Sequence, residues 1–127
     1  MKILIVKLSS IGDIIHTLPV LSAIRSKFVN AEITWVVEKN SAEILRGNTL
    51  ISKLIEIDTK SIRKKDSFGK NFNLAAQQFK ELRDTKFDVV LDFQGLWKSA
   101  AIAKLARAKN DSALPKKPCA NRQADFY

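Results

Sequence analysis

The sequence predicts an α/β fold, a Rossmann-like parallel sheet with flanking helices, from two observations. Short runs of apolar, mainly β-branched residues recur along the chain, as in strands buried on both faces of a parallel sheet. A segment with helical spacing or helix-start residues precedes every run after the first, which is the alternation of βαβ units. The expected strands are Lys2–Lys7, Glu32–Val37, Lys53–Ile57 and Asp88–Asp92.

The first expected helix lies between the first two strands and has one apolar face. Pro19 interrupts this face and lacks the backbone N–H that a helix interior needs. We therefore expect a short helical turn around Gly12–Thr17, with a kink or fresh start near Pro19. The apolar positions, at steps of four, three, three and four, are Ile14, Leu18, Leu21, Ile24 and Phe28.

Three further helices are expected. Asn40 and Glu43 resemble a capping pair, and Gly47 stands where a left-handed cap would, which predicts a short helix over Ser41–Arg46. A second amphipathic face consists of Phe72, Ala75 or Ala76, Phe79 and Leu82, and an alanine-rich helix should cover Leu96–Ala108.

The length and composition indicate one soluble domain. We expect it to cover residues 1–108, followed by a divergent or truncated tail at 109–127 that contains two prolines and little periodicity. The apolar runs are too short to span a bilayer, and Met1 leads directly into a strand without a secretory signal, so we expect a cytoplasmic location. Cys119 and His16 have no metal-ligand spacing, which predicts no metal site.

The formal charge of +9 predicts anionic partners but does not choose among them. Nucleic acid, phospholipid and phosphorylated saccharide all fit a field of this sign. The chain carries no recognisable nucleic-acid-binding motif, so we expect no nucleic acid partner.

Two polar segments follow the first and last expected strands, where open parallel sheets bind ligands. The first is Lys7–Asp13, in which Ser9, Ser10 and Gly12 would let backbone amides approach an anion at a helix start. A single glycine does not make the G-x-G-x-x-G pattern of dinucleotide binders. The second is Asp92–Gly95.

Asp13 has two interpretations. As a carboxylate in the first turn of a helix it would complement the helix dipole. As a general base facing a crevice it would take a proton from an attacking hydroxyl group. Spacing alone favours the first interpretation.

The other polar residues at these positions also have alternatives. Asp92 is interpreted as capping the following helix, whereas Gln94 and Gly95 either bind a ligand or form a tight turn. Trp35 and Trp97 are interpreted as packing residues. A run of cations after the third strand is either a solvated loop or a phosphate clamp, and consists of Lys60, Arg63, Lys64 and Lys65.

The segment KILIVKLSSIGDIIHTLP, which begins at Lys2 and ends at Pro19, resembles the opening motif of the bacterial lipopolysaccharide heptosyltransferases of glycosyltransferase family 9. The segments WVVE, from Trp35, and FDVVLDFQGLWKSAA, from Phe87 to Ala101, support the resemblance. It extends over roughly the first 108 residues.

The resemblance implies the N-terminal half of a GT-B glycosyltransferase, which binds the acceptor. Such enzymes transfer heptose from ADP-heptose to a Kdo residue of Kdo-lipid A, with inversion, without an obligatory metal or other cofactor, at the cytoplasmic face of the inner membrane. Asp13 falls at the position of the catalytic base, and Lys7, Ser10 and Gly12 match motif residues around it.

The resemblance also implies that cations after the third strand face the phosphorylated acceptor, here Lys60, Arg63 and Lys64. The donor would bind mainly to a C-terminal domain that we expect this chain to lack, so we expect the chain to be inactive alone. The remaining alternative is a non-catalytic module that binds acidic saccharide or lipid phosphate through the Lys60–Lys65 segment.

Overall fold

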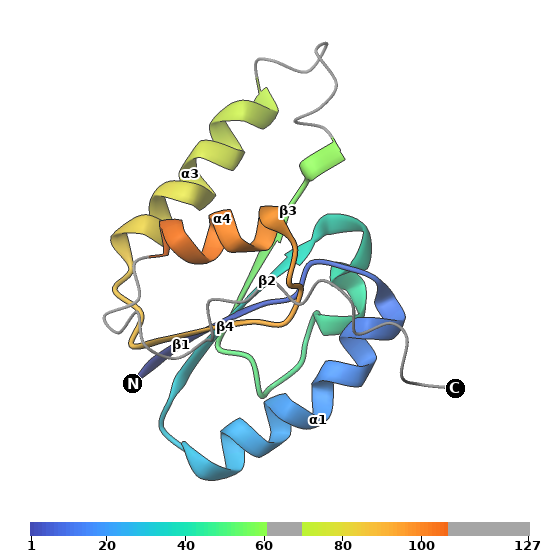
Figure 1. The fold of residues 1–127 in the computed structure, drawn as a ribbon, viewed down its shortest axis with the longest axis vertical. Helices are drawn as coiled ribbons and strands as arrows, with labels where there is room; N and C mark the ends of the chain where they lie inside the picture. Colours follow the sequence, from blue (N-terminus) through green and yellow to red (C-terminus); the bar gives the residue numbers. More distant parts are fainter. Residues whose placement is uncertain (61–69, 107–127) are drawn as a thin grey trace.

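The computed structural model describes residues 1–60 and 70–106, apart from some side chains in the first turns of α3. Strands and helices alternate along the chain, with α1 on one face of the sheet and α3 and α4 on the other (Figure 1). The elements are β1 (Lys2–Val6), α1 (Ile11–Lys27), β2 (Glu32–Glu38), the 3₁₀ helix η1 (Lys39–Leu45), β3 (Lys53–Ile57), α3 (Lys70–Asp84), β4 (Val89–Asp92) and α4 (Trp97–Leu105).

The strands form one parallel sheet in the order β3-β2-β1-β4, which confirms the predicted fold class. The chain first adds strands on one side of β1 and then returns to place β4 on the other side. The strand order therefore reverses at β1, between β1 and β4. In open α/β sheets the crevice beyond the carboxyl ends at such a reversal is the usual ligand site.

Alternate residues of each strand enter two separate apolar cores. Because successive side chains point to opposite faces, β1 sends Ile3 and Ile5 toward α1, and Leu4 and Val6 toward α3 and α4. The first core also contains Ile14, Leu21, Ala31, Ile33, Trp35, Val37, Ala42 and Leu45. The second also contains Leu8, Val36, Ile55, Ile57, Leu82, Phe87, Ile102 and Ala106.

Helix α1 is continuous from Ile11 to Lys27, so the predicted break near Pro19 is wrong. The side chains of Pro19 and Ile15 are both exposed. The proline ring removes the donor to the Ile15 carbonyl, but water can hydrate this carbonyl on the exposed side. Ile14 and Leu21, one on each side of Pro19 in the sequence, are buried in the same core and so hold both halves of the helix against the sheet.

The predicted short helix exists but starts earlier and is a 3₁₀ helix. It begins at Lys39, with Glu38 rather than Asn40 as its N-cap residue. Gly47 follows the C-cap residue with a φ of 76°, which confirms the left-handed position expected for it.

Helices α3 and α4 cover the second core. Leu82 is buried and Phe79 packs against the core as predicted, whereas Ala76 is exposed, and Phe72 and Ala75 lie outside the described side chains. Helix α4 ends at Leu105, with Ala106 as its C-cap residue, so it is shorter than the expected helix over Leu96–Ala108. The expected domain boundary at residue 108 lies outside the described residues.

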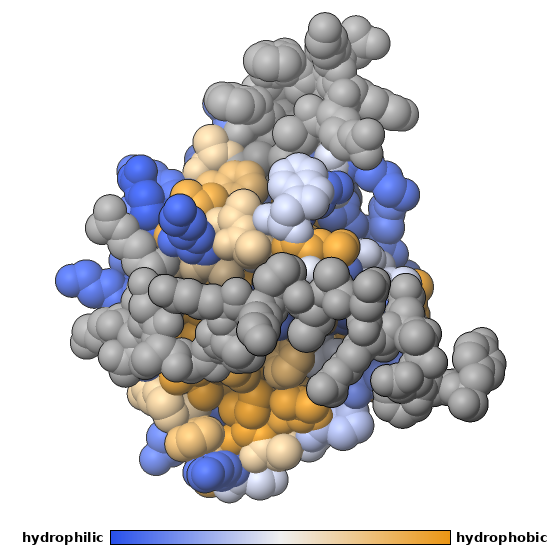
Figure 2. Space-filling model, in the orientation of Figure 1, coloured by the Kyte–Doolittle hydropathy of each residue, from blue (hydrophilic) through white to orange (hydrophobic). Residues whose placement is uncertain are grey.

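The packing prediction holds for Trp35, which is fully buried, but is wrong for Trp97, which is 77% exposed. Trp97 is the first residue of α4, and its ring contacts the Lys98 ammonium at 5.7 Å from the centroid. Figure 2 shows apolar residues at the surface both in the upper part of the view, around α3 and α4, and in the lower part, around α1.

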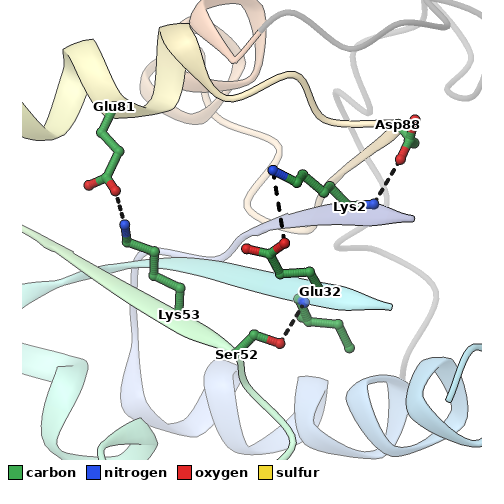
Figure 3. A network of polar contacts seen from close by, with 7 residues as sticks. Lys2, Glu32, Ser52, Lys53, Glu81 and Asp88 are labelled. Atoms are coloured by element: carbon green, nitrogen blue, oxygen red, sulfur yellow. Dashed lines mark hydrogen bonds and ion pairs between the residues drawn. The ribbon is translucent and has the colours of Figure 1, made fainter. Parts of the chain in front are cut away.

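Polar contacts tie together the amino ends of the strands (Figure 3). Lys2 donates its backbone N–H to Asp88 at 2.8 Å and pairs with Glu32, while Lys53 pairs with Glu81 of α3. Exposed pairs of this kind contribute only about 0–1 kcal/mol each. These contacts therefore align the strands more than they stabilise the fold. They lie at the opposite end of the strands from the turns that carry Asp13 and Gln94.

None of the helices within 1–60 and 70–106 is both long and apolar enough to cross a bilayer.

Candidate active site at the carboxyl edge of the sheet

The two polar segments predicted from the sequence lie side by side at the carboxyl edge of the sheet. β1 and β4 are neighbours, and Val6 stands opposite Asp92 in the register. The turns after these strands are in direct contact, because Gln94 Oε1 accepts hydrogen bonds from Leu8 N at 3.1 Å and Ser9 N at 3.3 Å. The structure thus brings the Asp13 turn and the Gln94 turn together at the reversal of strand order.

Asp13 lies in the first turn of α1, three residues after the N-cap residue Ser10. Its Oδ2 accepts hydrogen bonds from Ser10 N at 3.2 Å and from Ser10 Oγ at 3.1 Å. Asp13 is exposed, and its Oδ1 has no hydrogen-bond partner within the described parts of the chain. One carboxylate oxygen therefore caps the helix, while the other stays available to a ligand.

The hydrogen bond from the Ser10 backbone lowers the pKa of Asp13 below its usual value of 3.8, and the Ser10 hydroxyl and the Lys7 charge add to this effect. Hydrogen bonds and positive charges favour the ionised form. Asp13 is therefore a carboxylate throughout the neutral range, the form that can accept a proton, and its lowered pKa makes it a weaker base than an ordinary aspartate.

Replacing Ser10 by alanine should raise the pKa of Asp13 only part of the way toward 3.8, because the backbone donor remains. A titration of the Asp13 carboxyl carbon by NMR measures this change. Since the folded pKa is the lowered one, the stabilisation by ionised Asp13 is present above the unfolded value and is lost as pH falls through the folded pKa. A pKa that stays unchanged in Ser10→Ala would contradict the role given to the hydroxyl.

Lys7 is buried at the end of β1, with only 9% of its surface exposed. Its Nζ donates to Phe93 O at 3.3 Å, and its own carbonyl accepts from Trp35 Nε1 at 3.2 Å. Lys7 therefore connects the ends of β1 and β4 and places a positive charge beneath the Asp13 turn.

Asp92 holds the turn after β4. Its Oδ1 accepts from Gln94 N at 2.9 Å and Gly95 N at 3.1 Å, and its Oδ2 lies 2.9 Å from the hydroxyl of Ser99. Asp92 thus satisfies amides of the turn before α4, whose N-cap residue is Leu96, so the prediction that Asp92 caps this helix is wrong. Gly95 has a φ of 66°, which confirms its part in a tight turn.

The small residues of the first turn differ in their surroundings. Ser9 is half-buried and is held through its backbone, whereas Ser10 is exposed. A Cβ atom at Gly12 would meet no atom within 4 Å of it in the described structure. The fold therefore does not require glycine at position 12, and the space beside its backbone is open.

Glu38, at the end of β2, is a site residue that the sequence analysis missed. It is 9% exposed, and its two carboxylate oxygens accept from Thr59 N and Thr59 Oγ1, each at 2.9 Å. Its backbone N–H donates to Leu8 O at 2.9 Å. Glu38 therefore joins the start of the basic segment to the Asp13 turn. The sequence could have indicated Glu38, because it lies at the carboxyl end of a strand, where open parallel sheets bind ligands; the same rule indicated Asp92.

Of the cations expected to face an acceptor, only Lys60 lies within the described residues, and it is exposed. Arg63, Lys64 and Lys65 fall outside them.

Comparisons with known proteins point to one family. The glycosyltransferase family 9 (heptosyltransferase) model matches residues 75–117. Lipopolysaccharide heptosyltransferase 1 of Pseudomonas aeruginosa is 34% identical to this chain, in an alignment that covers all of this chain and 36% of the relative. The enzyme of the same name from Escherichia coli K12 is 36% identical, in an alignment that covers 80% of this chain and 32% of the relative.

Solved structures show the same relationship. E. coli heptosyltransferase WaaC with ADP superposes with a TM-score of 0.74 at 34% identity, covering 85% of this chain and 34% of the other. A family 9 glycosyl transferase from Veillonella parvula shares the fold, with a TM-score of 0.68 at 22% identity, over 85% of this chain and 30% of its own.

The parallel sheet and the reversal of strand order define a Rossmann-like domain, and its similarity to solved heptosyltransferase structures makes it a domain of the glycosyltransferase class. The chain belongs to glycosyltransferase family 9, the heptosyltransferases. It spans about a third of the length of the curated relatives it matches.

Proposed function

We propose that this chain is the N-terminal, acceptor-binding domain of a GT-B heptosyltransferase of the lipopolysaccharide inner core, with Asp13 as its general base. The enzyme would transfer heptose from ADP-heptose to a Kdo residue of Kdo-lipid A, with inversion and without a metal. The observation that carries this proposal is the exposed Asp13 carboxylate beside the reversal of strand order, in a chain similar to E. coli heptosyltransferase WaaC, which was solved with ADP and with ADP-2-deoxy-2-fluoro heptose.

The proposed reaction is a single displacement at the anomeric carbon of the donor. An acceptor hydroxyl attacks this carbon, Asp13 Oδ1 takes the hydroxyl proton, and the bond between the anomeric carbon and the ADP phosphate oxygen breaks. Proton transfer to a positioned carboxylate contributes about 10²–10⁴ in rate. The hydrogen bonds from Ser10 and, to a smaller extent, the charge of Lys7 favour the ionised form of Asp13 before the attack.

The basic segment supplies the proposed contact with acceptor phosphates. Lys60 follows Thr59, which Glu38 holds at the carboxyl edge of the sheet, near the turn that carries Asp13. Ser9, Ser10 and Gly12 would line the approach to the hydroxyl. Arg63 and Lys64 would add charge, although they lie outside the described residues.

A chimaera tests this function, with residues 1–108 of this chain replacing the matching part of E. coli lipopolysaccharide heptosyltransferase 1. We expect it to transfer heptose from ADP-heptose to Kdo-lipid A, whereas the 127-residue chain alone should give no turnover. Acceptor binding by both proteins with no transfer by the folded chimaera would instead support a non-catalytic module that binds acidic saccharide or lipid phosphate.

The exposed apolar side chains near α4 support a proposed peripheral contact with the cytoplasmic face of the inner membrane. Leu96 is 53% and Trp97 77% exposed, and Lys98 adds a cation beside them. Aromatic and basic residues together favour the interface of an anionic membrane. The chain should co-sediment with vesicles that contain phosphatidylglycerol, and less so after Trp97→Ala. Equal recovery with and without vesicles would argue against this contact.

A further inference from the structure

The side chain of Gln94 contacts the backbone of the turn that leads to Asp13. Its single oxygen accepts from two consecutive amides, Leu8 N and Ser9 N, across 85 or 86 residues of sequence. The geometry points to Gln94 as a positioning residue for Asp13, acting through this turn. The role rests on the proposed function, in which Asp13 is the base.

The backbone of Gln94 is itself held by the side chain of Asp92. Asp92 Oδ1 accepts the backbone N–H groups of Gln94 and Gly95, and Asp92 Oδ2 lies within hydrogen-bond distance of the buried Ser99 hydroxyl. A chain of hydrogen bonds therefore runs from α4 through the β4 turn to Leu8. The side chain oxygen of Gln94 has little freedom to leave the two amides.

The orientation of the Asp13 carboxylate depends on the same turn, the one that follows β1. Its Oδ2 is held by Ser10, which directly follows Ser9. Leu8 is held on both sides. Its N–H donates to Gln94, in the turn after β4, and its carbonyl accepts from Glu38 N, at the end of β2, at 2.9 Å. Loss of the Gln94 contact would release Ser9 and Ser10, and with them the orientation of the Asp13 carboxylate.

Such a shift has a large effect in catalysis. A misplacement of about 1 Å in a reacting group costs about 10²-fold in rate. Gln94 reaches its contacts through Oε1 alone, and its Nε2 has no hydrogen-bond partner within the described residues. This asymmetry separates a positioning role, which needs the oxygen, from ligand binding, which would use the nitrogen.

The first test uses the 127-residue chain and needs no enzymatic activity. NMR titration of the Asp13 carboxyl carbon should show a pKa closer to 3.8 in Gln94→Ala than in the unchanged chain, because Ser10 no longer holds its two donors in place. Asn48→Ala is the matched control, since Asn48 Oδ1 accepts Leu50 N at 3.0 Å in a loop at the other edge of the sheet. Asn48→Ala should leave the Asp13 titration unchanged. An unchanged Asp13 titration in Gln94→Ala would overturn the inference.

The second test uses the chimaera and compares Gln94→Ala with Gln94→Glu. Glutamate keeps an oxygen for the two amides but removes the N–H donors. Gln94→Ala should lower kcat about 10²-fold with little change in KM for the acceptor, and Gln94→Glu should restore most of it. A glutamate variant as slow as the alanine variant, with a raised KM, would assign Gln94 to ligand binding instead. If the unaltered chimaera is folded but inactive, the proposed function fails, while the Asp13 titration still decides the role of Gln94.

Discussion

Replacing Asp13 by asparagine in the chimaera should lower kcat for heptose transfer by about 10²–10⁴. Asparagine keeps an oxygen that can accept from Ser10 N, so the start of α1 should remain capped. It cannot take up the proton of an acceptor hydroxyl. The loss should therefore appear in kcat, while KM for Kdo-lipid A and for ADP-heptose changes little, and initial rates of ADP release measure it.

Asp84→Asn is the matched control for this prediction. Asp84 is also an exposed aspartate, at the end of α3, where it pairs with the adjacent Arg83. Its replacement removes one negative charge far along the sequence from the Asp13 turn, and the rate should stay the same. Undiminished transfer by Asp13→Asn, or an equal loss in both variants, would refute the assignment of Asp13 as base.

Replacing Trp35 by alanine should give the largest loss of stability of any single change considered for this chain. Trp35 is fully buried in the core under α1, and its indole N–H satisfies the carbonyl of Lys7. Its removal leaves a cavity and an unpaired carbonyl, at a cost of about 3–5 kcal/mol. This is a large share of the roughly 5–15 kcal/mol that holds a typical domain folded. Urea unfolding followed by circular dichroism measures the difference.

The chain provides its own control, because the only other tryptophan is exposed. Trp97→Ala should change the free energy of unfolding by no more than about 0.5 kcal/mol, as is usual for surface positions. Similar losses for the two variants would show that Trp35 is not the packing centre that its burial indicates.

The strands were predictable because a buried parallel strand needs a continuous apolar run, and few other elements produce one. Ile3, Val36 and Val90 lie in such runs, and all belong to the sheet. The Asp13 turn was predictable for a related reason, since position at the carboxyl end of a strand follows once the strands are known.

Other features depend on contacts between distant segments, which local patterns do not reveal. Pro19 was expected to break α1, but the break depends on whether water reaches the freed carbonyl, and this is set by how the whole helix lies on the sheet. The pairing of Glu38 with Thr59 and that of Gln94 with Leu8 depend on strand order, which one sequence does not specify. The exposure of Trp97 was not predicted, because the hydrophobicity of a residue in the first turn of a helix does not say whether its side chain faces the core.

The central place of β1 in the sheet has a consequence for the order in which the molecule assembles. Of the four described strands, β1 is synthesised first, yet one of its two neighbours, β4, is followed by a turn whose contact between Leu8 and Gln94 spans 86 residues of sequence. Pairing between segments so distant along the chain is slow, because the loop must close before its contacts form. The hydrogen bonds from Gln94 to the Asp13 turn therefore cannot form until residue 94 has been synthesised. The proposed catalytic geometry is then completed in the same step of folding as the pairing of β1 with β4.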